Sequence, residues 1–168
     1  AQSLFDYEAD RVVRAIEQRV RSYLNGVKGA RGTAIVLSGH VTRSAFDAYI
    51  RSRDTDTEFP GMRGVGIIDR VALEDEARYL AAARRDGAPD FAIRSIAPHS
   101  DERFVIRLIE PVERNAQAVG LDIGSEAKRR AAALRSLETG EAQLTAPITL
   151  VQALERPRTG LLLLAPIY

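Results

Sequence analysis

Residues 104–110, Phe-Val-Ile-Arg-Leu-Ile-Glu, form the stretch that decides the fold. In an extended chain the apolar side chains lie on both faces, with Phe104, Ile106 and Leu108 on one and Val105 and Ile109 on the other. A strand with two apolar faces is typical of a sheet that is covered on both sides. The stretch therefore predicts a central strand, and Arg107 is a charge that interrupts it.

Apolar periodicity and turn residues on either side of this strand predict the other elements. Before it we expect a helix from Thr42 to Arg53, a strand over 64–71, a helix from Leu73 to Arg85 and a strand from Phe91 to Ile96. After it we expect a helical segment from Arg114 to Val119, a helix from Glu126 to Thr139 capped by Ser125 and ended by Gly140, and strands over 144–152 and 160–168. This order predicts an α+β fold: a long N-terminal helix followed by a PAS-like five-stranded antiparallel sheet flanked by helices on one face.

The N-terminal stretch predicts that long helix. Apolar residues between Phe5 and Val27 recur with a mean gap of about 3.7 residues, close to the helical period. The helix should weaken near Gly26, Gly29 and Gly32, because glycine is a poor helix former. A narrow apolar stripe can dock on its own domain or pair with a second copy. We therefore divide the chain into a stalk or dimerisation helix, 1–32, and a domain, 33–168.

Composition excludes several classes of function. The charge is only +1, from 24 Lys and Arg against 23 Asp and Glu, which argues against nucleic-acid binding. The chain has no cysteine, so disulfides, zinc–thiolate sites and thiol catalysis are excluded. The longest apolar run, Leu161 to Ala165, is far shorter than the roughly 20 residues of a membrane helix.

Motifs for catalysis or cofactor binding are weak. His40 and His99 lie in loop-like sequence without another ligand at metal spacing, so we interpret both as surface residues and expect no metal and no cofactor. Arg63-Gly64-Val65-Gly66 partly resembles the pyrophosphate loop of acetyltransferases. That loop should enter a helix, whereas this segment predicts a strand, so a small acyltransferase is the weaker alternative.

Two charged residues in apolar surroundings are the candidate site residues. Asp122 lies between Leu121 and Ile123, and a carboxylate in such a run needs partners. It either caps the helix that follows or faces a cavity and accepts hydrogen bonds from a ligand. If it binds ligand, Asp122→Ala should remove binding with little loss of fold; if it is a cap, the cost is about 0.5–2 kcal/mol. Arg107 is either the structural partner of Asp122 or a donor to an anionic ligand.

Several segments together resemble the CHASE domain, an extracytoplasmic sensing module of histidine kinases and nucleotide cyclases. They are Arg63–Val71, Arg103–Asn115, Gly120–Glu126, Thr139–Glu141, Leu144–Val151 and Leu162–Tyr168, in the same order as in the family. The resemblance runs from about Gly29 to Tyr168. It implies a stalk helix followed by a membrane-distal PAS-like unit, which is our domain 33–168, and a membrane-proximal unit that is largely absent.

The resemblance also implies a location, partners and site residues. We expect a periplasmic or extracellular domain of an inner-membrane protein, anchored by transmembrane helices that flank it. In the plant cytokinin receptors, which are similar, residues at the positions of Asp122 and Leu144 contact the ligand through a carboxylate and through backbone groups. We add Thr145 and Arg107 as further ligand-binding residues.

The resulting hypothesis is a small-molecule sensor, not an enzyme. Its ligand is unknown, with a purine or cytokinin-like compound as one option, and it forms a homodimer through the N-terminal helix. A structural or protein-interaction module that binds no ligand is the alternative.

Overall fold

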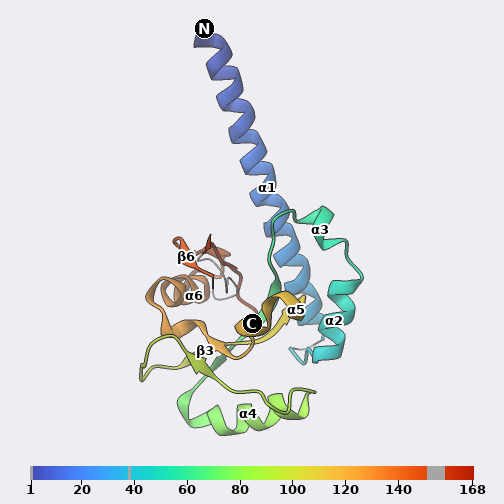
Figure 1. The fold of residues 1–168 in the computed structure, drawn as a ribbon, viewed down its shortest axis with the longest axis vertical. Coiled ribbons are helices and arrows are strands. Elements are labelled where there is room, and N and C mark those ends of the chain that lie inside the picture. The colour runs from blue at the N-terminus through green and yellow to red at the C-terminus, as the bar shows by residue number, and fades with distance from the viewer. Residues whose placement is uncertain (1, 38, 151–157) are drawn as a thin grey trace.

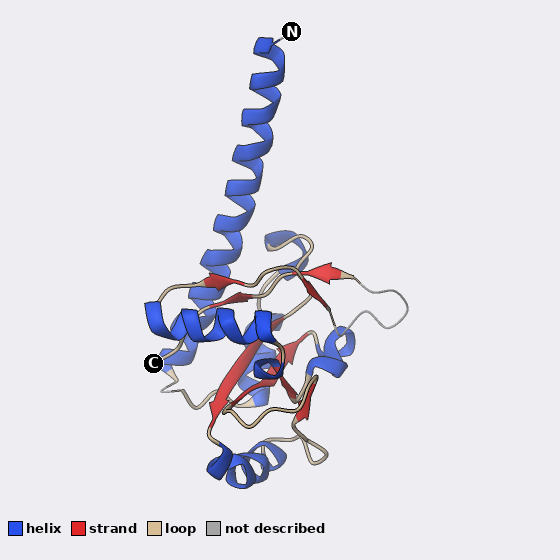
Figure 2. Ribbon diagram, turned by 90° about the vertical axis from the view of Figure 1, so that its left-hand side faces the viewer, coloured by secondary structure: helices blue, strands red, loops and turns tan. Residues whose placement is uncertain are grey.

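The computed structural model describes residues 2–37, 39–150 and 158–168. At its centre lies a four-stranded mixed sheet, with the strands in the order β1 (Val65–Val71), β3 (Arg103–Glu110), β4 (Leu121–Asp122) and β2 (Arg94–Ser95). Strand β3 is antiparallel to both neighbours, whereas β2 runs parallel to β4. Figure 2 shows the strands of this sheet among the helices that surround them.

Two pairs of short antiparallel strands lie outside this sheet. They are β5 (Gln143–Leu144) with β8 (Leu163–Leu164), and β6 (Ile148–Thr149) with β7 (Thr159–Gly160). Strand β6 lies beside helix α6 (Ala127–Thr139), as Figure 1 shows.

The expected five-stranded antiparallel sheet is therefore not what the described residues form. Residues 91–96 contribute only two strand residues, and these pair in parallel. The expected strand over 144–152 is split, because Pro147 has no N–H to donate to a ladder. Residues 151 and 152 of that strand lie outside the described residues.

Apart from α3 (Thr55–Glu58), which the sequence analysis does not predict, the helices fall close to the predicted positions. They are α1 (Gln2–Val36), α2 (Arg43–Arg51), α3 (Thr55–Glu58), α4 (Glu76–Arg85), α5 (Val112–Asn115) and α6, with single 3₁₀ turns at Leu73–Asp75, Ala116–Ala118 and Ile123–Ser125. Thr42 caps α2, since its hydroxyl accepts from the Ala45 amide. At α6 the cap is Glu126 rather than Ser125, because the Glu126 carboxylate accepts hydrogen bonds from the backbone amides of Lys128 and Arg129. Gly140 ends α6 in the left-handed conformation, as predicted.

Helices cover both faces of the sheet, not one as expected. On one face Phe104 shares a buried cluster with Ala133 of α6. On the other, Leu108 packs in a cluster with residues of α1 and α2, and Val105 packs in a cluster with residues of α4. The prediction that residues 104–110 form a strand covered on both sides is confirmed.

The expected division of β3 into two faces is wrong after Ile106. Ile68 pairs with Ile106, but the preceding residue Ile67 pairs with Leu108, so Arg107 has no paired residue in the β1–β3 ladder. An extra residue in one strand reverses the alternation of the side chains that follow it. Leu108 consequently packs in a different cluster from Ile106.

Helix α1 projects from the body of the molecule and then packs along it (Figure 1). Residues 3–21 are all exposed, and partial burial begins at Ser22. The helix continues through Gly26, Gly29 and Gly32, so the expected weakening there is wrong. A Cβ at Gly26 would lie 2.6 Å from the Phe59 ring, so the absence of a side chain lets the loop before β1 rest directly on the helix.

The same loop is hydrogen-bonded to α1. The carbonyl oxygen of Pro60 accepts a hydrogen bond of 2.6 Å from the Tyr23 hydroxyl and one of 2.8 Å from the Arg19 guanidinium. Because β1 begins five residues later, at Val65, these contacts connect α1 to the start of the central sheet.

Candidate functional site

Asp122 lies at the end of β4 and is completely buried, with 0% of its surface exposed. Its Oδ1 atom accepts hydrogen bonds of 2.9 Å from the backbone amides of Phe104 and Gly124. With this exposure, no space large enough for a water molecule touches the side chain. The carboxylate thus fixes the start of β3 and caps the 3₁₀ turn after β4, rather than capping α6.

The other carboxylate oxygen, Oδ2, meets the side chain of His99, from the loop between β2 and β3, and that of Arg103, the first residue of β3. The Nε2 atom of His99 lies 2.7 Å from Oδ2, and the Arg103 guanidinium lies 3.6 Å from it. Arg103 also donates to the His99 carbonyl oxygen at 3.1 Å and lies 3.4 Å from Glu76 of α4. His99, Arg103 and Asp122 form one polar cluster, which we call the Asp122 cluster; Asp122 is fully buried in it, and the other two side chains are partly buried.

The backbone around the Asp122 cluster is held by short hydrogen bonds. Ser125 donates its hydroxyl to the Asp122 carbonyl oxygen at 2.6 Å and accepts from the Ile96 amide at 2.8 Å. Gly120 has a φ of +78°, and a Cβ there would lie 2.1 Å from the carbonyl oxygen of Ala92. Only glycine fits this close approach, which brings β2 alongside β4.

Arg107 lies in a second polar cluster, away from Asp122. Its guanidinium donates to Asp69 at 2.5 Å and to the Val41 carbonyl oxygen at 2.8 Å, and it lies 3.8 Å from Asp86. The Tyr79 hydroxyl donates to the same Asp69 oxygen at 3.0 Å, and its burial beside that carboxylate raises the Tyr79 pKa well above its usual range. Arg107 therefore connects the sheet to the segment before α2 and to the residue that ends α4, and it is not the partner of Asp122.

Leu144 and Thr145 lie in or directly after β5. The Leu144 side chain is 54% exposed, whereas Thr145 is buried. The Thr145 hydroxyl accepts from the Leu162 amide at 3.0 Å, and its amide donates to the Leu162 carbonyl oxygen at 2.9 Å. Within the described ranges, no hydrogen bond or ion pair joins any two of the four predicted site residues, Asp122, Leu144, Thr145 and Arg107.

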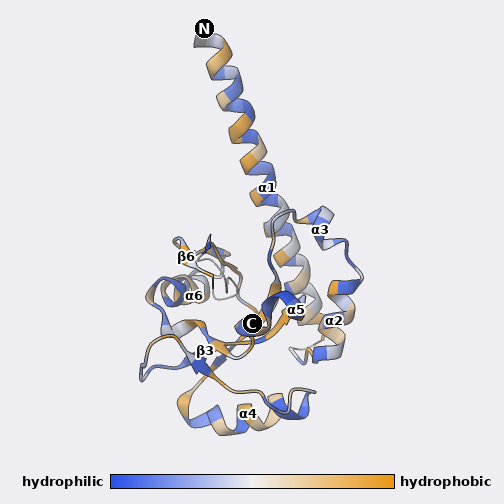
Figure 3. Cartoon of the chain, viewed as in Figure 1, coloured by the Kyte–Doolittle hydropathy of each residue, from blue (hydrophilic) through white to orange (hydrophobic). Residues whose placement is uncertain are grey.

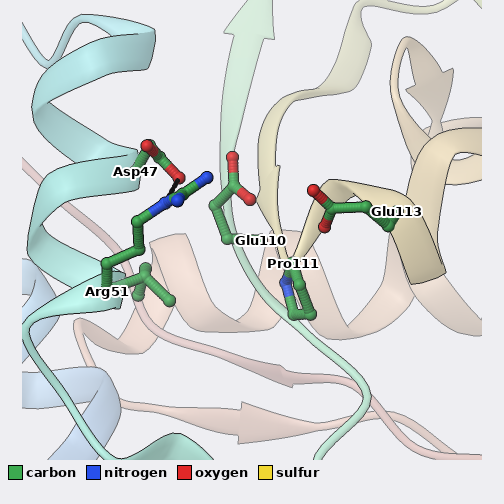
Figure 4. Close-up of a pocket in the computed structure, with 6 residues that line it drawn as sticks. Asp47, Arg51, Glu110, Pro111 and Glu113 are labelled. Atoms are coloured by element: carbon green, nitrogen blue, oxygen red, sulfur yellow. Dashed lines mark hydrogen bonds and ion pairs between the residues drawn. The ribbon is translucent and has the colours of Figure 1, made fainter.

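A hollow of about 280 Å³ lies elsewhere, between α2 and the end of β3. Its lining consists of Asp47, Ile50, Arg51, Glu110, Pro111 and Glu113, and Figure 4 shows the three carboxylates around it. Asp47 is paired with Arg51 at 2.7 Å, and Glu110 accepts from the Val112 amide at 2.9 Å. No group of three or more acidic, His or Cys residues in the part of the chain that the structure describes could hold a metal ion.

His99 and Arg103 were missed as site residues from the sequence. We interpreted both histidines as surface residues; His40 is exposed, but the His99 side chain is only 14% exposed. His99 and Asp122 are 23 positions apart and meet because β2 and β3, whose connecting loop contains His99, both pair with β4. No local spacing marks such a pair, so the sequence contains no signal for it.

These features define a mixed α/β domain on a projecting helix, with a buried carboxylate at the centre of its sheet. The sequence model of the CHASE domain matches residues 39–168, so the chain belongs to the CHASE domain family. CHASE domains are extracytoplasmic sensing modules of signalling receptors and are not themselves catalytic. A comparison with curated proteins finds no match. In the described ranges, no helix combines the length and apolar character needed to cross a membrane.

Proposed function

We propose that this chain is the ligand-sensing domain of a membrane-anchored receptor, of the histidine kinase or nucleotide cyclase type, on the periplasmic or extracellular side of an inner membrane. The observation that carries the proposal is the family match over residues 39–168. The sensing unit is 33–168, the membrane-distal and PAS-like part of the receptor, and 1–32 is its stalk.

In this proposal Asp122 accepts a hydrogen bond from the ligand through Oδ2. Its Oδ1 atom is held by two backbone amides, which fix the carboxylate whatever happens at the other oxygen. The polar contacts of Oδ2 within the described residues are with the side chains of His99 and Arg103, and side chains can change rotamer without unfolding the sheet. A small molecule therefore reaches Asp122 when the loop between β2 and β3 moves.

The other predicted residues receive unequal support. Leu144 offers backbone groups on an exposed strand, and Thr145 keeps a hydroxyl proton that it can still donate, since its oxygen acts as the acceptor for Leu162. Arg107 has the least support, because its guanidinium is already bound to Asp69 and Val41. A purine or cytokinin-like compound is one option for the ligand.

We also propose a homodimer through α1. The projecting half of this helix carries an apolar stripe that is open to solvent, with Phe5, Val12, Ile16 and Val20 between 45% and 70% exposed. Figure 3 shows apolar residues alternating with polar ones along it. A parallel second helix would bury this stripe, and ligand binding would then favour one arrangement of the two stalks.

A structural module without a ligand is the second candidate. Asp122 is completely buried and accepts two hydrogen bonds from backbone amides, and these features favour the structural module because they are expected of a residue that stabilises the fold.

A thermal-shift screen separates the two candidates. A compound at 100 times its Kd adds about 2.7 kcal/mol to the stability of a protein that binds it. The sensing proposal expects at least one compound among purines, amino acids and carboxylates to raise the melting temperature of the wild-type chain. A screen in which no compound stabilises the protein favours the structural module.

A further inference from the structure

The Nδ1 atom of the His99 ring lacks a hydrogen-bond partner in the described part of the chain. This atom is also buried. The nearest acidic group, the carboxylate of Asp101, lies 3.9 Å away and is itself 3.8 Å from Arg130 of α6. A buried ring nitrogen without a partner destabilises the position that holds it.

The other ring nitrogen, Nε2, has two neighbours that cannot both be satisfied. It lies 2.7 Å from Oδ2 of Asp122 and 2.9 Å from Nη1 of Arg103. A carboxylate only accepts hydrogen bonds and a guanidinium only donates them. With a proton on Nε2, the ring donates a hydrogen bond to Asp122 but turns an N–H toward the N–H donors of Arg103. Without that proton, Nε2 accepts a hydrogen bond from Arg103 but turns a lone pair toward the Asp122 carboxylate.

Asp122 does not depend on His99 for its own position. Its Oδ1 atom keeps the amides of Phe104 and Gly124 if the imidazole leaves. Departure of the ring exposes an acceptor, Oδ2, and a donor, Arg103 Nη1, that lie 3.6 Å apart. A molecule that carries a donor and an acceptor on adjacent atoms satisfies both groups, which the single Nε2 atom cannot do.

We propose that His99 is an internal ligand of Asp122, and that the external ligand is a small planar molecule with an N–H donor next to an acceptor atom, which displaces the imidazole. This inference rests on the proposed sensing function. Without ligand, His99 occupies the site beside Asp122. The ligand takes its place because it can form hydrogen bonds to Asp122 and to Arg103 at the same time, which His99 cannot.

The test uses pyrazole, which carries an N–H donor and a nitrogen acceptor on adjacent atoms, and calorimetry on the wild-type chain and on His99→Ala. We expect pyrazole to bind His99→Ala more tightly than wild type, by about tenfold or more. The matched control is His40→Ala, which removes the exposed histidine and should bind pyrazole as wild type does. N-methylpyrazole lacks the donor and should bind His99→Ala about tenfold more weakly than pyrazole, or worse.

Equal pyrazole affinities of wild type and His99→Ala would overturn the proposal, as would equal binding of pyrazole and N-methylpyrazole to the variant. A His99→Ala chain that fails to fold overturns it too, because the fold would then depend on His99. In the wild-type chain, which has two histidines, NMR should show saturable shifts of the His99 ring and not of the His40 ring when pyrazole is added. No response of the His99 ring up to the solubility limit contradicts the displacement.

These outcomes are distinct from failure of the sensing function. If the thermal-shift screen finds a ligand whose binding needs Asp122, but pyrazole behaves identically in wild type and His99→Ala, only the role of His99 falls. If pyrazole binds His99→Ala as expected but the screen finds no compound that stabilises wild type, the site is real and the sensing function falls.

Discussion

At the residue scale, the two oxygens of Asp122 have different kinds of partner. Oδ1 is bonded to backbone amides of β3 and of the turn after β4, whereas the polar contacts of Oδ2 in the described part of the chain are with side chains. One buried carboxylate can therefore brace the fold and offer a ligand acceptor at the same time. The sequence suggested these two roles as alternatives, and the geometry makes them compatible.

This division predicts different effects of two substitutions at Asp122. Asp122→Ala leaves the amides of Phe104 and Gly124 unpaired and removes the buried carboxylate beside Arg103, and we expect a loss of about 3–5 kcal/mol in the free energy of unfolding. Asp122→Asn keeps an oxygen for both amides and should cost distinctly less. Urea unfolding measures both, with Asp90→Asn, on the exposed surface, as the control. A loss for Asp122→Ala within the 0.5–2 kcal/mol of an ordinary cap would mean that the carboxylate stabilises the fold no more than a cap does.

Tyr79 predicts a pH dependence of stability. Burial and the neighbouring Asp69 raise its folded-state pKa above the unfolded value of about 10. A raised pKa contributes stability that is present below the unfolded pKa and is lost as pH rises above it, because only the unfolded chain then ionises. Urea unfolding should show a steeper loss of stability above about pH 10 for wild type than for Tyr79→Phe. Equal slopes of the two proteins would argue that Tyr79 is not buried against Asp69.

At the scale of elements, the contact between α1 and the Phe59–Pro60 turn is tested by two glycines of the same helix. A Cβ at Gly26 meets the Phe59 ring at 2.6 Å, whereas nothing lies within 4 Å of a Cβ at Gly32. Gly26→Ala should therefore lower the free energy of unfolding by about 1–3 kcal/mol, as overpacking does. Gly32→Ala should raise it by about 0.5–1 kcal/mol, since alanine favours the helix. A stabilising Gly26→Ala in thermal or urea unfolding would show that the turn does not rest on the helix.

The exposed stripe of α1 makes a prediction about assembly. Ile16→Glu places a charge in the middle of the stripe, and we expect sedimentation to show a dimer for wild type and a dimer dissociation constant raised about tenfold or more for the variant. Gln18→Glu adds the same charge to the opposite side of the helix and should dimerise as wild type does, because successive residues turn by about 100°. A wild-type chain that stays monomeric at high concentration would remove the stripe as a dimer seam.

At the scale of the whole molecule, the sequence predicted the elements that carry a long periodic signal. The period of α1, the apolar strands β1 and β3, and the end of α6 at Gly140 are all confirmed. The other strands have only two residues each, which is too short for any alternation to be read. The register shift that leaves Arg107 unpaired in the β1–β3 ladder cannot be predicted either, because it depends on how the two strands pair and not on either strand alone.

The candidate site was predictable only in part, for a related reason. Asp122 was found because a charge in an apolar run needs partners, but the partners themselves come from elsewhere in the chain. His99 reaches it through the loop between β2 and β3, and the Phe104 amide reaches it through the pairing of β3 with β4. Arg107 was grouped with Asp122 because both are charges among apolar residues, yet the topology puts them in separate clusters.

The central claim is that Asp122 is the hydrogen-bond acceptor of a sensing domain. Its most direct test is calorimetric titration of the compound selected by the thermal-shift screen into the wild-type chain, Asp122→Asn and the control Asp90→Asn. We predict that Asp122→Asn raises the dissociation constant about tenfold or more while remaining folded, and that Asp90→Asn binds as wild type does. A folded Asp122→Asn chain that binds the compound as tightly as wild type would contradict the account.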